Sequence, residues 1–177
     1  MIGWFDLVAL QEIKENFGPL FDVMDLLGKR FRVVFSDVAG NNERMAFVYN
    51  ADRVSLLEEV GELAFPVRDL EHVAIEGIRQ RFEGFDRPPY IATFRCGRIC
   101  LTFINVHLYF GSAGKSGMDR RSLETYAVAR YAALRRKAKF GFTRELVALG
   151  DFNMPKAGRQ RSDLQGADEP GAQGTGA

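Results

Sequence analysis

The sequence predicts an α/β domain, and three observations carry that prediction. Short, strongly apolar runs typical of buried strands recur along the chain, and amphipathic segments of helical period lie between them. The 177 residues are 46% hydrophobic and include 15 Phe, which is enough to fill the core of one domain. The composition changes near the C-terminus, so we expect one folded domain over residues 1–156 and a separate tail over 157–177.

The N-terminal half is expected to begin with a strand and a helix. Residues 5–13 carry apolar side chains on both parities, which predicts a strand buried on both faces. Residues 14–29 have apolar side chains at spacings of three and four, typical of an amphipathic helix that ends at Gly28. Further strands are expected at three places: 31–38, 44–50 and 54–65. The mixed pattern of 69–89 allows no assignment.

The C-terminal half predicts a hairpin, a helix and a last strand. Residues 90–108 contain two apolar strands joined at Gly97 and Arg98. Residues 119–140 predict an amphipathic helix, with one side formed by Leu123, Tyr126, Ala127, Arg130, Tyr131 and Leu134. Residues 146–153 predict another buried strand. The tail is expected to be disordered because residues 158–177 contain five glycines and a single large apolar side chain.

The overall charge identifies no class of partner. Lys plus Arg number 24 and Asp plus Glu 23, so no global field favours a nucleic acid or a membrane. The segment from Lys115 to Arg144 contains nine basic residues and two acidic ones. This local excess of positive charge indicates either a surface that steers a polyanion or a solvated helix face. Cys96 and Cys100 are interpreted as ordinary strand residues.

Localisation is predicted from what the sequence lacks. The N-terminus has no signal-peptide pattern, and no apolar run approaches the roughly 20 residues of a membrane helix. We therefore expect a cytoplasmic protein without a transmembrane segment, and no protein partner is evident.

Polar side chains stand where three of the expected strands end. They are Gln11 with Glu12, Asn105 with His107, and Asp151 with Asn153. Because residues i and i+2 of a strand share a face, each of the last two pairs points in one direction. Convergence on one site is one interpretation. The alternatives are helix caps or salt-bridge partners for the carboxylates and a satisfied core position for the histidine.

The sequence around these strand ends resembles the endonuclease/exonuclease/phosphatase superfamily, the deoxyribonuclease I-like proteins. LVALQEI is similar to its glutamate motif, INVHL to its histidine motif and LGDFN to its Asp-x-Asn motif, in the family's order. NERMAFVYN resembles the family's arginine-bearing strand, and PPYIATFR its lead-in to the histidine strand. The resemblance covers roughly residues 5–156. It implies a four-layer α/β sandwich, with two mainly antiparallel sheets packed face to face between helices.

The resemblance also implies a function, the metal-dependent hydrolysis of phosphodiesters or phosphomonoesters, most readily by a nuclease-like enzyme. The substrate is then a phosphate ester, with nucleic acid, phosphoinositide and sphingomyelin as candidates. Glu12 would bind Mg²⁺ or Mn²⁺, hard cations that favour oxygen ligands. His107 would be the general acid or a donor to the phosphate. Asp151 would orient or help to deprotonate the attacking water.

The remaining residues have supporting roles in this interpretation. Asn153 would donate to a phosphoryl oxygen in the transition state. Arg44 would contact the phosphate, with a solvated surface arginine as the alternative. Gln11 and Asn105 would fix their catalytic neighbours. Tyr49 is expected to pack in the core, and His72 to lie on the surface.

Two parts of the family pattern are not found in this sequence. One is an asparagine-bearing strand ahead of the glutamate motif, and the other is a Ser-Asp-His motif near the C-terminus. We therefore expect an incomplete sandwich, truncated at both ends. One choice of codons for residues 159–176 spells a family-like helix in the +1 frame, so the tail is interpreted as out of frame. The alternatives are a catalytically inactive remnant, a lipid-directed phosphodiesterase or phosphatase of the same family, or an unrelated α/β protein.

Overall fold

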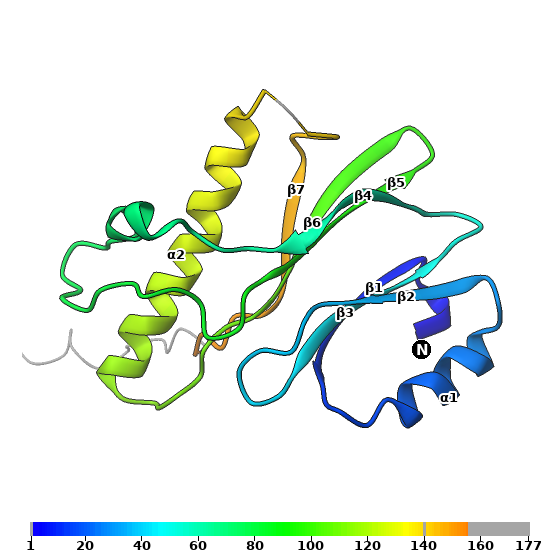
Figure 1. Cartoon of the computed structure of the whole chain (residues 1–177), viewed down its shortest axis with the longest axis horizontal. Coiled ribbons are helices and arrows are strands. Elements are labelled where there is room, and N and C mark those ends of the chain that lie inside the picture. Colours follow the sequence, from blue (N-terminus) through cyan, green and yellow to red (C-terminus); the bar gives the residue numbers. More distant parts are fainter. Residues whose placement is uncertain (1, 140, 156–177) are drawn as a thin grey trace, which may run out of the picture.

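The computed structural model describes residues 2–139 and 141–155, which form two β-sheets and two α-helices (Figure 1). The elements in chain order are η1 (Ile2–Trp4), β1 (Leu7–Ile13), α1 (Gly18–Leu27), β2 (Phe31–Phe35), β3 (Arg44–Asn50), β4 (Ser55–Glu62), η2 (Val67–His72), β5 (Tyr90–Cys96), β6 (Ile99–His107), α2 (Lys115–Lys137) and β7 (Leu146–Asp151). This confirms the predicted α/β class. The tail predicted at 157–177 lies outside the described residues.

The seven strands divide into a three-stranded and a four-stranded sheet. The first sheet has the order β1-β3-β2 and is antiparallel throughout. The second has the order β4-β5-β6-β7, in which β7 runs parallel to β6 and the other pairs are antiparallel. The predicted hairpin is confirmed, because β5 and β6 pair up to Cys96 and Ile99 around a turn that contains Gly97 with φ +57°.

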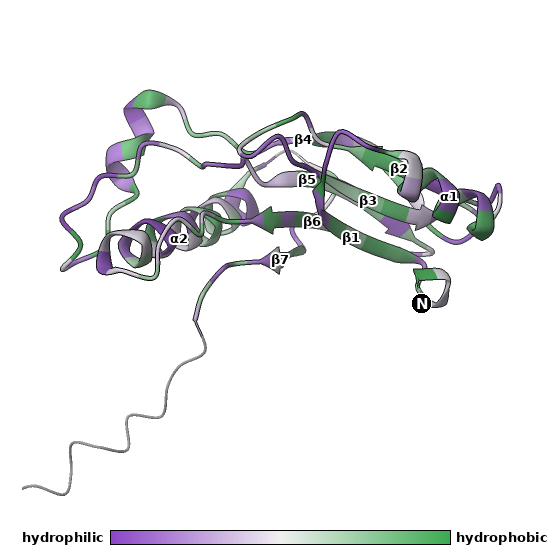
Figure 2. Ribbon diagram, turned by 90° about the horizontal axis from the view of Figure 1, so that it is seen from below, coloured by the Kyte–Doolittle hydropathy of each residue, from purple (hydrophilic) through white to green (hydrophobic). Residues whose placement is uncertain are grey.

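The main core lies between the two sheets. Aromatic side chains from both sheets meet there, with the Phe47 ring 5.5 Å from that of Tyr90 and 5.4 Å from that of Phe94. Tyr49 belongs to this core, as predicted. The opposite face of the second sheet packs on α2, where Ile104 and Val106 are fully buried. In both views α1 and α2 lie at opposite ends of the molecule (Figure 2).

Two strands predicted to be buried are more exposed than expected. The apolar residues of β1 are only half-buried, and β7 alternates between half-buried and exposed positions, with Val147 39% exposed. The reason is their place in the sheets, because each pairs with a single neighbouring strand among the described residues. Apolar composition predicted the strands correctly, but it did not distinguish a central strand from an edge strand.

Both helices form, with shifted ends and, in α2, a different buried face. Helix α1 is shorter than the predicted 14–29 and ends as expected at Gly28, which has φ +79°. Helix α2 begins and ends earlier than the predicted 119–140. Leu123 and Ala127 are buried as expected, whereas Tyr126 and Leu134 are 38% and 51% exposed. The buried side of α2 includes polar side chains instead, namely Arg121 and Glu124.

The unassigned segment 69–89 forms an irregular cover over α2. Its Val73 and Phe82 pack against Leu123 and Ala127 of the helix. His72 is exposed at the end of η2, as predicted. Among the described residues, no helix is both long and apolar enough to cross a membrane.

Candidate active site

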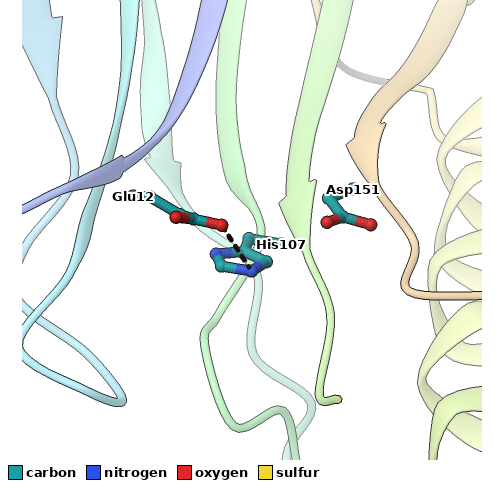
Figure 3. A group of neighbouring side chains, drawn as sticks. All are labelled: Glu12, His107 and Asp151. Carbon is teal, nitrogen blue, oxygen red and sulfur yellow. Dashed lines mark ion pairs between the residues drawn. The ribbon is translucent and has the colours of Figure 1, made fainter.

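Three strands end at one edge of the molecule, and each brings one titratable side chain to the same place. Glu12 comes from β1, His107 from the end of β6 and Asp151 from the end of β7 (Figure 3). One potential ligand atom from each lies within 4.8 Å of the others. In Figure 3 the two carboxylates stand on either side of the imidazole, and the ion pair between His107 Nε2 and Glu12 Oε1 spans 3.7 Å.

Local backbone features place the two carboxylates. The ladder between β1 and β3 shifts register between Leu10 and Ile13, and Glu12 lies in that irregularity with φ +59°. Such a bulge turns a side chain away from the regular alternation, at a cost in backbone strain. Asp151 is set opposite His107 by the parallel register of β6 and β7. One residue earlier, Gly150 allows close approach, because a Cβ there would lie 2.1 Å from Val106 O.

His107 is held between two carboxylates of different exposure. Its side chain is 8% exposed, and Nδ1 lies 3.2 Å from Oε2 of Glu43, whose side chain is 7% exposed. Both atoms are buried, and neither has a hydrogen-bond partner within the described chain, so we infer that they face each other as an imidazole–carboxylate pair. This leaves Nε2 directed at the more exposed Glu12, where it can donate or accept a proton.

Two basic residues fix Glu43 and the end of β6. Lys14 Nζ lies 2.7 Å from Glu43 Oε1, and Arg87 Nη1 lies 3.6 Å from Glu43 Oε2. Arg87 is 4% exposed and also donates to the carbonyl oxygens of His107 and Leu108, at 2.8 and 3.0 Å. A buried guanidinium with this many partners holds both the imidazole's backbone and the carboxylate that faces its ring.

Asn105 joins the two sheets directly behind the site. It is fully buried and donates from Nδ2 to the carbonyl oxygens of Leu10 and Ala46, at 2.9 and 3.1 Å. Its Oδ1 accepts from Gln11 Nε2 at 2.6 Å. The two residues expected to fix their neighbours therefore bond to each other, and they connect β6 with β1 and β3.

The two predicted phosphate contacts lie in different places. Asn153 follows β7 with φ +52°; its backbone N–H donates to Asp151 Oδ1 at 2.7 Å, and its Nδ2 donates to Leu108 O at 2.6 Å. A primary amide has two N–H donors, so the second can serve a ligand. Arg44 instead lies over the Phe17 ring, with Cζ 5.2 Å from the ring centroid. Among the described residues, no hydrogen bond or ion pair joins Arg44 to Glu12, His107 or Asp151.

Sequence reasoning missed Glu43 and Arg87, although the signal for Glu43 was present. The predicted site residues stand at the ends of strands, whereas Glu43 stands just before the start of β3. Because β3 runs antiparallel to β1, its start lies beside the end of β1, with Arg44 paired to Ile13. Arg87 belongs to the irregular segment before β5, where no periodic pattern gives a prediction.

A buried carboxyl group lies on the helix behind the site. Glu124 of α2 is fully buried and accepts from the backbone N–H groups of Asp86 and Tyr109, at 3.1 and 2.8 Å. Burial raises the pKa of its carboxyl above the usual range, and the two backbone hydrogen bonds and Arg120 oppose that rise. Glu124 thereby ties α2 to the segments on both sides of β5 and β6.

The donor set at the strand ends fits a divalent cation. Glu12 and Asp151 offer carboxylate oxygens, which Mg²⁺ and Mn²⁺ favour, and His107 offers a nitrogen that Mn²⁺ accepts more readily than Mg²⁺. The Glu12 side chain is 63% exposed, so an ion bound there would keep positions open to water and a ligand. Glu12 and Asp151 thus form a potential metal site, and His107 Nε2, next to Glu12, stays available for proton transfer.

Comparison with known proteins finds likeness in structure only. No protein-family model and no curated protein sequence matches this chain. ANGEL2, a 2',3'-cyclic phosphatase, has a similar structure with TM-score 0.55 and 18% identity over 86% of this chain. Humanized D. rerio TDP2 gives a TM-score of 0.53 and 17% identity over 88% of this chain, and the human Nocturnin catalytic domain gives 0.53 and 15% over 86%.

These likenesses concern part of each larger structure. The chain spans 40% of the ANGEL2 chain, 56% of the TDP2 chain and 52% of the Nocturnin chain. All three are members of the endonuclease/exonuclease/phosphatase superfamily. The chain therefore has the deoxyribonuclease I-like fold of that superfamily, as its sequence motifs predicted.

Proposed function

We propose that this chain carries the active-site edge of a divalent-metal-dependent phosphoric ester hydrolase, with nucleic acid as its first candidate substrate. One observation carries the proposal: Glu12, His107 and Asp151 come from three separate strands and meet within 4.8 Å. Two carboxylates beside an oriented imidazole suit attack of water on a phosphate ester.

Each residue has a chemical task in the proposed reaction. A Mg²⁺ or Mn²⁺ ion bound at Glu12 would neutralise charge that develops on the phosphate. Asp151 orients the attacking water and accepts its proton, and the water oxygen bonds to phosphorus as the bond to the leaving oxygen breaks. His107 donates a proton from Nε2 to that leaving oxygen, while Glu43 steadies Nδ1. The free N–H of Asn153 hydrogen-bonds a phosphoryl oxygen.

The solved structures with the same fold support nucleic acid as the substrate class. One structure of ANGEL2 contains adenosine-2',3'-vanadate, and one structure of D. rerio TDP2 contains a single-stranded DNA product. Lys115, which is exposed at the start of α2, agrees with an anionic polymer. The helix as a whole is not a free basic face, because Arg121 is buried and Arg135 forms an ion pair with Glu59.

The proposal is tested by hydrolysis of a fluorescent single-stranded oligonucleotide with Mg²⁺, with Mn²⁺ and with EDTA. We expect turnover that EDTA abolishes and that falls by about 100-fold or more in Glu12→Gln and in Asp151→Asn. The exposed Glu15 provides the matched control, since Glu15→Gln changes the same charge near Glu12. Turnover that persists in EDTA, or that falls equally in the control, would refute the proposal. Metal binding without turnover would identify a non-catalytic relative.

A further inference from the structure

The loop between β6 and α2 is fixed by contacts with the helix. The backbone N–H of Tyr109 donates to Glu124 at 2.8 Å, and the guanidinium of Arg120 lies over the Tyr109 ring, 4.1 Å from its centroid. Arg121 Nη1 donates to the carbonyl oxygen of Ser112 at 3.0 Å. Arg121 is 2% exposed, so this anchor is buried. The position of the loop is therefore determined by the fold.

Phe110, in the middle of this anchored loop, is left 55% exposed. Arg121 donates to the carbonyl oxygen of Phe110, and its Cζ also lies 5.4 Å from the centroid of the Phe110 ring. The next residue, Gly111, has φ +57° and packs so closely on the Tyr109 ring that a Cβ would clash with it. The hydrogen bonds of Arg121 and the tight packing at Gly111 thus fix the backbone on both sides of Phe110, and they keep its ring exposed to solvent.

Phe110 lines a cleft that continues into the candidate active site. The cleft has a volume of about 310 Å³, and its walls include Asp151 and Asn153 as well as Phe110 and Arg121. Met154, the residue after Asn153, lines it too and is 46% exposed. Two exposed apolar side chains therefore border the same space as two residues with proposed roles in catalysis. The volume is at the lower end of the range for small-molecule sites.

We propose that this cleft binds the nucleobase next to the scissile phosphate, with Phe110 as the stacking platform and Met154 as a second apolar contact. The inference rests on the proposed function, because Asp151 and Asn153 would place the phosphate at the inner end of the cleft. An aromatic ring backed by a guanidinium is a surface on which bases stack with little dependence on sequence. A lipid chain would be favoured by a wholly apolar wall, whereas Arg121, Asp151 and Asn153 make three of the eight lining residues polar.

The inference is tested by a binding measurement that needs no turnover. Fluorescence anisotropy compares a labelled single-stranded oligonucleotide with an abasic oligonucleotide of the same length, both in EDTA so that metal-dependent hydrolysis cannot proceed. We expect the wild-type chain to bind the base-bearing strand between about 5-fold and 150-fold more tightly. Phe110→Ala should remove this preference, and Phe110→Tyr should retain it. The control is Phe142→Ala, which removes another exposed ring, 49% exposed, that does not line the cleft.

The remaining outcomes of this experiment distinguish the nucleobase site from the proposed hydrolase. Equal affinity of the wild-type chain for the two strands, or a preference that survives Phe110→Ala, would overturn the nucleobase site even if hydrolysis is observed. A base preference that depends on Phe110 without hydrolysis would support the nucleobase site and refute the proposed enzyme. Displacement of the strand by octyl phosphate at the concentration at which a mononucleotide displaces it would assign the cleft to an alkyl chain and overturn the inference.

Discussion

The two ends of strand β6 differ sharply, although β5 pairs with it from Ile99 to Asn105. At the hairpin end, Ile99 is 61% exposed and turns back to Cys96. At the other end, Asn105 is fully buried and His107 nearly so, and both are surrounded by polar partners. Hydrogen bonds from the first sheet reach β6 at this second end, where Asn105 donates to Leu10 of β1 and Ala46 of β3. The candidate active site therefore lies where the two sheets meet, and its position depends on both sheets and not on β6 alone.

Among substitutions at the two ends of β6, the largest expected effect is the loss of catalysis when His107 is replaced. His107→Gln should lower kcat/KM of the proposed hydrolysis by about 100-fold to 10,000-fold, the usual contribution of a general acid. Ile99→Gln, the matched change at the hairpin end, should leave the rate unchanged. Steady-state kinetics with the oligonucleotide substrate measures both. Equal losses in the two variants would show that the ends of β6 do not differ in function.

The next effect is on stability, through the polar contact between the sheets. Asn105→Ala leaves the carbonyl oxygens of Leu10 and Ala46 buried without their donor, so we expect a loss of about 3 kcal/mol in the free energy of unfolding. Cys100→Ala, nearer the hairpin, should cost less than about 1 kcal/mol. Urea unfolding measures both values. A similar cost at the two positions would contradict a special role for the buried amide.

A third effect is the loss of stability when either of two glycines is replaced, Gly97 beside the hairpin end of β6 and Gly150 beside its other end. Gly97→Ala puts a side chain into open space at φ +57° and should cost about 1–2 kcal/mol. Gly150→Ala should cost about 1–3 kcal/mol more, because φ is +126° and the new Cβ would lie 2.1 Å from Val106 O. It should also displace Asp151. Thermal unfolding gives the comparison, and a smaller cost at Gly150 would contradict the close approach of β7.

The smallest effect concerns the pH dependence of stability behind the site. Because burial raises the pKa of Glu124, the folded chain retains a proton that the unfolded chain releases. The stability contributed by that proton is present below the ordinary pKa of 4.5 and is lost as the pH rises through the raised value. Glu124→Gln cannot titrate. The wild-type chain should therefore lose stability relative to this variant as the pH rises, in urea unfolding; a flat or opposite trend would contradict the assignment.

The sequence predicted most helices and strands, because apolar runs mark the strands. It also predicted that three strand ends meet, because polar residues end each of these three apolar runs. It did not reveal which strands lie at sheet edges, since β1 and β7 have the composition of central strands. The spacing of apolar residues also did not predict which face of α2 is buried, because the polar side chains of Arg121 and Glu124 are buried against the backbone of loops. Arg87 depends on contacts with segments distant in sequence, which no local pattern encodes, and the place of Glu43 follows only once β3 is paired antiparallel with β1.

The most direct test of the central claim is the binding of Mn²⁺, followed by electron paramagnetic resonance. If Glu12 of β1 and Asp151 of β7 hold one metal ion beside His107 of β6, the wild-type chain should bind an ion whose affinity falls by about 10-fold or more in both Glu12→Gln and Asp151→Asn, as loss of a ligand requires. Glu15→Gln should bind Mn²⁺ as the wild type does. The same affinity in all four proteins would contradict the account, because Glu12 and Asp151 would then share no metal ion.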